Sequence, residues 1–89
     1  MKNYPITNSA DTHFFQTIHA YLKGRSDLIE VEEIVDVDGA GVVRYVLGNK
    51  ELYLVQELLL DQVVAKSEHD ISDIVGNIRD YLANNDINV

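Results

Sequence analysis

Asp36, Asp38 and Gly41 have the spacing of the first, third and sixth positions of an EF-hand calcium loop. Such a loop also needs an oxygen ligand at its fifth position and a bidentate glutamate at its twelfth. Those positions are Ala40 and Leu47 here, so two ligands are lost. The flanking segments also alternate like strands, whereas a calcium loop joins two helices. The segment is therefore interpreted as a hairpin turn and not as a metal site.

The other residue types that could perform chemistry are few and poorly spaced. His13 and His19 would lie on different faces of a helix, whereas two histidine ligands on one helix are spaced by four. His69 precedes Asp70, but aspartate at the start of a helix is a common cap. The chain has no cysteine and no GxSxG, P-loop or Rossmann glycine pattern. We therefore expect no enzyme, no cofactor and no bound metal.

The charge balance is strongly acidic, with 15 aspartates and glutamates against 7 lysines and arginines and a net charge of −8. Such a surface repels nucleic acid phosphates and anionic lipid, and it favours basic protein surfaces. No apolar run approaches the ~20 residues of a membrane span, and the amino terminus lacks the apolar core of a signal peptide. The absence of cysteine fits a reducing compartment. We expect a cytoplasmic protein that binds neither nucleic acid nor membrane.

The length and the apolar patterning predict a small single α+β domain over residues 1–89. Helices are predicted over 8–24 and 69–85, and strands over 28–37, 42–47 and 51–55. Asp38-Gly39 and Gly48-Asn49 are two-residue hairpin signals that join the strands into a three-stranded antiparallel meander. The order is thus α-β-β-β-α. An ambiguous fourth element, residues 58–66, precedes the last helix and suits either one helical face or a strand.

The two predicted turns set a register for the meander. The turn at Asp38-Gly39 places Glu33 opposite Arg44 and Val35 opposite Val42. The turn at Gly48-Asn49 places Arg44 opposite Tyr53. We expect Glu33 and Arg44 to pair across the strands, because a buried unpaired charge is costly.

This register gives the sheet two apolar faces. The leucine face comprises Ile34, Val43, Tyr45, Leu47, Leu52 and Leu54. The valine face comprises Val31, Val35, Val37, Val42, Val46, Val55, Tyr53, Glu33 and Arg44. Two short helices usually cover one face, and the larger side chains of the leucine face suit a helix–sheet gap. We expect the valine face to be covered by residues 58–66, a second subunit or another protein.

Six acidic residues and no basic residue lie between positions 27 and 38. They are Asp27, Glu30, Glu32, Glu33, Asp36 and Asp38. Strand alternation places Glu30, Glu32 and Asp36 on one face and Glu33 on the other. The segment is interpreted either as a charged edge strand that resists aggregation or as an acidic ridge for a basic partner.

The order of elements resembles that of the double-stranded-RNA-binding domain. That family uses lysines at the start of its second helix to hold phosphates. This chain has Ser67-Glu68-His69-Asp70 there, so RNA binding is not expected even with a shared topology.

These patterns favour a small acidic protein–protein interaction module that binds a basic partner surface. The most specific version of this prediction is an inhibitor, an immunity-type protein or a nucleic-acid mimic. The expected partner-binding residues are Glu30, Glu32, Glu33, Asp36, Asp38, Val35, Val42, Arg44 and Tyr53. One alternative is a structural homo-oligomer, most simply a homodimer through the valine face. Another is a small-molecule binder that uses a sheet pocket with Tyr45, Tyr53 and histidine.

Overall fold

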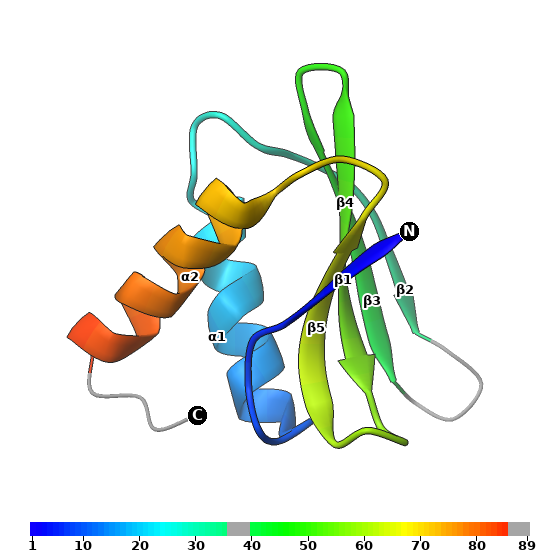
Figure 1. The fold of residues 1–89 in the computed structure, drawn as a ribbon, viewed down its shortest axis with the longest axis vertical. Helices are drawn as coiled ribbons and strands as arrows, with labels where there is room; N and C mark the ends of the chain where they lie inside the picture. The colour runs from blue at the N-terminus through cyan, green and yellow to red at the C-terminus, as the bar shows by residue number, and fades with distance from the viewer. Residues whose placement is uncertain (36–39, 86–89) are drawn as a thin grey trace.

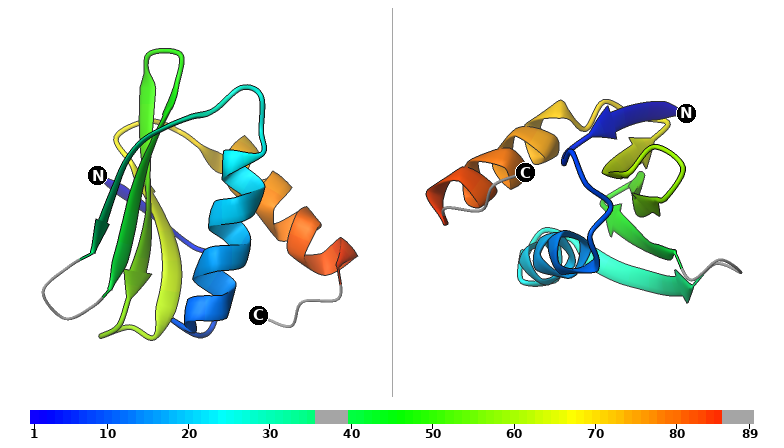
Figure 2. Two further views of the ribbon diagram at one scale, coloured as in Figure 1. Left: turned by 180° about the vertical axis from the view of Figure 1, so that it is seen from behind. Right: turned by 90° about the horizontal axis from the view of Figure 1, so that it is seen from below.

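One antiparallel sheet of five strands carries two helices on the same face (Figures 1 and 2). The structure is a computed structural model that describes residues 1–35 and 40–85. The elements are β1 (Lys2–Pro5), α1 (Thr12–Lys23), β2 (Ile29–Val35), β3 (Gly41–Leu47), β4 (Lys50–Glu57), β5 (Gln62–Ser67) and α2 (Ser72–Asn84). The strand order is β1-β5-β4-β3-β2. The predicted α+β class is confirmed, with β2, β3 and β4 as the expected meander.

Two strands extend the predicted meander. The ambiguous element is a turn followed by strand β5, which pairs with β4 through Val55 opposite Val64. Strand β1 was not predicted, and it pairs with β5 through Pro5 opposite Val64. An edge strand tolerates proline because its free side needs no hydrogen-bond donor.

Aspartate side chains hold the start of both helices. Asp11 accepts a hydrogen bond from the His13 N–H at 2.7 Å, which caps α1. Asp70 accepts from the Ser72 N–H at 3.0 Å, although the backbone places the cap of α2 at Ile71. Hydrogen bonds from Ser72 lower the pKa of the Asp70 carboxyl below its ordinary value. The stabilising effect of that carboxylate is therefore lost only as the pH falls through the lowered pKa.

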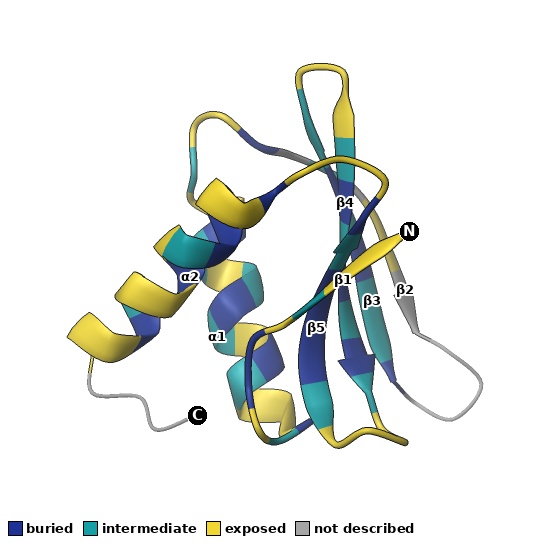
Figure 3. Cartoon of the chain, viewed as in Figure 1, coloured by how far each residue is buried: buried dark blue, intermediate teal, exposed yellow. Residues whose placement is uncertain are grey.

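The core lies between the helices and the leucine face of the sheet, which confirms the predicted side for the β3 and β4 residues of that face. The assignment of Ile34 to it is wrong, because Ile34 lies opposite Val42. Its fully buried side chains include Ile18 and Leu22 of α1, Ile78 and Leu82 of α2, and Val43, Tyr45, Leu52 and Leu54 of the sheet. Figure 3 shows buried residues on the sides of both helices that face the strands. Within residues 1–35 and 40–85, neither helix has the length and apolar character needed to cross a membrane.

Tyr45 is the largest fully buried side chain of the described residues. Burial raises the pKa of its phenol well above the ordinary value, and the negative charges of Glu30 and Glu33 raise it further. The hydroxyl is therefore protonated at neutral pH. It forms a hydrogen bond with Nδ1 of His19.

The register between β2 and β3 differs from the prediction by one residue. Glu32 lies opposite Arg44 and Glu33 lies opposite Val43. The pairing also shifts between Glu30 and Glu32, which marks a β-bulge. The expected pairings of Glu33 with Arg44 and of Val35 with Val42 are thus wrong, because Val35 lies opposite Gly41. The register between β3 and β4, with Arg44 opposite Tyr53, is as predicted.

A glycine-to-alanine pair gives the first testable prediction. A Cβ on Gly41 would lie 2.6 Å from the Phe15 ring, which is buried against the core. Gly41→Ala should therefore lower the free energy of unfolding by about 1–3 kcal/mol, the usual cost of overpacking. Gly76→Ala in α2 meets nothing within 4 Å and should raise it by roughly 0.5–1 kcal/mol. Urea unfolding followed by circular dichroism measures both changes. If the two variants changed the free energy of unfolding in the same direction, the packing of α1 on β3 would be contradicted.

Candidate functional site

Three consecutive leucines form the exposed turn between β4 and β5. Leu58, Leu59 and Leu60, here called the leucine tip, are 44%, 98% and 65% exposed. The turn is coloured as exposed in Figure 3, and it lies at the same end of the molecule as the start of α1 in Figure 1. Exposed single leucines are ordinary, but three adjacent ones on a protruding hairpin form an apolar projection.

The turn itself has a defined backbone geometry. The Asp61 N–H donates to the Leu58 carbonyl at 3.3 Å, which closes a four-residue turn with Leu59 and Leu60 at its corners. Asp61 follows with φ of 51°, a left-handed conformation that aspartate tolerates better than most residues. Its carboxylate accepts a hydrogen bond from the Ala10 N–H at 2.8 Å. The tip is thereby fastened to the segment that leads into α1.

Two buried polar side chains brace the same segment. Gln56 donates from Nε2 to the Ala10 carbonyl and accepts from the Gly41 N–H at 3.1 Å. Thr7 accepts from the Val63 N–H at 3.0 Å. These bonds connect β3, β4, β5 and the chain before α1 at the base of the tip. The base of the leucine tip is therefore held by hydrogen bonds to three strands and to the chain before α1.

Asp61 gives the second testable prediction. Asp61→Ala removes the acceptor of the Ala10 N–H and places alanine in the left-handed region, so unfolding should require about 1–3 kcal/mol less. Asp61→Asn keeps a residue that tolerates this φ and offers an amide oxygen to Ala10, so its loss should be clearly smaller. Chemical unfolding of the two variants measures the difference. Equal stability of Asp61→Ala and the wild type would show that Asp61 does not fix the tip.

The face away from the helices carries only part of the predicted partner surface. Val42, Arg44 and Tyr53 lie there and are half-buried. Glu32 is opposite Arg44 and belongs to the same face. The Val35 side chain, together with Asp36 and Asp38, lies outside what the structure describes. The predicted turn at Asp38-Gly39 and the first four positions of the rejected calcium loop fall there too, whereas Gly41–Leu47 of that loop form strand β3.

Glu30 and Glu33 lie on the opposite, helix-covered side of the sheet. Glu30 approaches Lys23 of α1 at 3.8 Å, and Glu33 is opposite the buried Val43. The expectation that Glu30 and Glu32 share a face, with Glu33 on the other, is therefore wrong. The bulge between Glu30 and Glu32 is the physical reason, because one extra residue reverses the alternation beyond it.

Two ion pairs lie beside the valines on the face of the sheet away from the helices, here called the open face. Arg44 forms a two-point contact with Glu51, with an Nη2–Oε1 distance of 2.8 Å. This hydrogen-bonded contact lowers the pKa of the Glu51 carboxyl and raises the pKa of the Arg44 guanidinium. Lys66 of β5 forms a single ion pair with Glu57 of β4 through its Nζ. Arg44 thus pairs within the described chain with Glu51 and not with Glu33.

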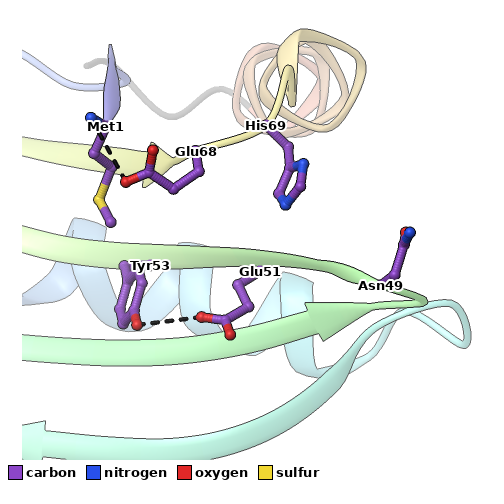
Figure 4. A pocket seen from close by; sticks show the side chains of 6 residues that line it. All are labelled: Met1, Asn49, Glu51, Tyr53, Glu68 and His69. Carbon is purple, nitrogen blue, oxygen red and sulfur yellow. Dashed lines mark hydrogen bonds and ion pairs between the residues drawn. The ribbon is translucent and has the colours of Figure 1, made fainter.

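A shallow pocket opens on this face near the β3–β4 turn (Figure 4). Its volume is about 220 Å³, below the roughly 300–1,000 Å³ of typical ligand sites. It is lined by Met1, Asn49, Glu51, Tyr53, Glu68 and His69. The Tyr53 hydroxyl donates to Glu51 at 3.3 Å. Tyr45 is buried on the other face, so Tyr45 and Tyr53 do not share the sheet pocket that the sequence suggested.

Comparison with known proteins gave no match to a family model, to a curated protein or to a solved structure. The leucine tip was missed in the sequence because apolar residues 59, 60, 63 and 64 also suit one face of a helix.

Proposed function

We propose that the chain is a protein-binding module that inserts the leucine tip into an apolar pocket on a basic partner protein. The observation that carries the proposal is the exposure of Leu59 and Leu60 on a braced hairpin. Turn corners ordinarily hold glycine, asparagine, aspartate or proline, so two leucines there contribute nothing to the local backbone geometry. Their apolar surface becomes favourable when a partner removes it from water.

The size of the tip is sufficient for specific recognition. Burial of one leucine side chain is worth about 1.5–3 kcal/mol, so Leu59 and Leu60 together supply roughly 3–6 kcal/mol. Since 1.4 kcal/mol is a factor of ten in affinity, the pair supplies about 100-fold or more. The turn bond and the Asp61–Ala10 bond hold the backbone in place, so little conformational entropy is lost on binding.

Acidic groups near the tip support a basic partner. Asp61 ends the turn, and the exposed Asp11 adjoins the Ala10 N–H that Asp61 binds. The whole chain carries a net charge of −8, which would raise the association rate with a basic surface. The more specific version of this proposal is an inhibitor or an immunity-type protein. The cysteine-free chain suits a reducing compartment such as the cytoplasm.

Differential capture tests the proposal. The wild type, the double variant Leu59→Ser/Leu60→Ser and the control Asn49→Ser would each be immobilised and exposed to an extract of the source cells. Asn49 is a matched control because it is exposed on the β3–β4 turn. A protein that the wild type and the control retain and the double variant loses would support the proposal once its binding is reconstituted with purified components. Equal retention by all three variants would contradict it.

The open face offers the second candidate, a homodimer. Val42, Val46 and Val55 are half-buried there without a covering helix. Light scattering after gel filtration distinguishes the candidates without a partner protein. A dimer that Val42→Lys converts to a folded monomer would favour self-association through this face, whereas a monomeric wild type at high concentration would exclude it.

A further inference from the structure

A histidine and two glutamates from different elements converge on the helix-covered side of the sheet. His19 comes from the middle of α1, and Glu30 and Glu33 come from β2. One ligand atom from each lies within 4.8 Å of the other two. His19 and Glu30 are half-buried and Glu33 is exposed, so the cluster is open to solvent on one side.

The β-bulge makes this convergence possible. In a regular strand, residues three apart point to opposite faces, so Glu30 and Glu33 would be separated by the sheet. The shift of pairing between Glu30 and Glu32 brings both carboxylates to the side of α1. Bulges are frequent beside functional sites, where they redirect a side chain.

The His19 ring is oriented by the core beneath it. Nδ1 is hydrogen-bonded to the hydroxyl of the fully buried Tyr45. Nε2 lies 3.9 Å from Oε1 of Glu30, which is too long for a hydrogen bond. A phenol oxygen also accepts hydrogen bonds, so the ring proton can reside on Nδ1 and leave Nε2 as a ligand. A metal-bound histidine ordinarily has such a partner on its other ring nitrogen.

We propose that His19, Glu30 and Glu33 bind one divalent transition-metal ion of the zinc type. Imidazole nitrogen and carboxylate oxygen are both zinc ligands, and these residues supply the three protein ligands that an open zinc site has. Calcium and magnesium prefer sites made only of oxygen, so the imidazole disfavours them. A bound ion would bring its ligand atoms to about 3.3 Å from one another, given metal–ligand distances of about 2.0 Å, so the observed separations need only a small closure.

An ion-pair network is the competing explanation of the cluster. Lys23 lies 3.8 Å from Oε2 of Glu30, and its side chain is largely exposed. A metal ion would take the place of this lysine, which can turn to solvent without leaving a buried charge behind. The two explanations differ in whether zinc binds to the purified chain.

Isothermal titration with zinc chloride tests the proposal on the full chain, with no partner present. We expect one ion per chain at micromolar concentration and at least about tenfold weaker binding for Glu33→Gln and for His19→Gln. His13→Gln is the matched control, because His13 is an exposed histidine of the same helix. Its affinity should equal that of the wild type.

Two further measurements keep the result unambiguous. Circular dichroism without metal checks that each variant folds, and Glu33→Gln is the safest variant because Glu33 is exposed. Nitrogen NMR of the histidine rings should show zinc perturbing Nε2 of His19. Binding weaker than millimolar, unchanged binding in Glu33→Gln, or loss of binding in His13→Gln would each overturn the proposal. None of these outcomes depends on the leucine tip, so this proposal and the proposed function fail separately.

Discussion

Replacement of Leu54 by alanine is expected to lower the free energy of unfolding by about 2–5 kcal/mol. Leu54 is completely buried on the side of the sheet that the helices cover. Its removal leaves a cavity between β4 and the helices that the surrounding side chains fill only in part. Since the free energy of unfolding of a small domain is about 5–15 kcal/mol, this single change removes a large part of it. Urea unfolding followed by circular dichroism measures the loss.

Val55 is the matched control for this prediction. It is the next residue of β4, points to the open face and is half-buried. Val55→Ala should cost only about 1 kcal/mol, because the missing methyl groups were already partly in contact with water. Equal losses for Leu54→Ala and Val55→Ala would contradict the account of one covered and one open face.

The side of the sheet that the helices cover could be predicted from the sequence. Gly48-Asn49 fixed the register of β3 against β4, because a two-residue hairpin turn leaves one pairing. That register placed Tyr45 opposite Leu52 and brought the large apolar side chains to one face. The helices followed from the periodicity of residues such as Ile18 and Ile78.

Long-range features were not predictable in the same way. The bulge near Val31 arises from the pairing of β2 with β3, and no local residue pattern marks it. Strand β1 exists because β5 offers it an edge, and its four residues with Pro5 carry no strand signal of their own. Because of this bulge, Glu33 lies on the helix-covered face and not on the predicted one.

The candidate sites were the least predictable part. The leucine tip needed the turn that Asp61 closes, and Asp61 follows the leucines without a glycine, asparagine or proline to mark the turn. The cluster at His19 needed the bulge. The spacing of His13 and His19 bears only on two ligands from one helix, whereas Glu30 and Glu33 come from a strand. The acidic segment was found because composition alone reveals it.

The largest effect on binding is expected from the leucine tip. Leu59→Ser/Leu60→Ser should weaken partner binding by about 100-fold or more, because it removes both side chains that the partner would take from water. Most of the change should appear in the dissociation rate, since the net charge that governs encounter is unaltered. Stability should change by no more than about 0.5 kcal/mol, because both side chains are exposed in the free chain.

Titration calorimetry with the purified partner tests this central claim most directly. The wild type, the double variant and Asn49→Ser would be compared in one buffer, after unfolding curves have shown that all three are folded. The account predicts a Kd about 100-fold or more higher for the double variant and an unchanged Kd for Asn49→Ser. The same Kd for all three proteins would contradict binding through the leucine tip.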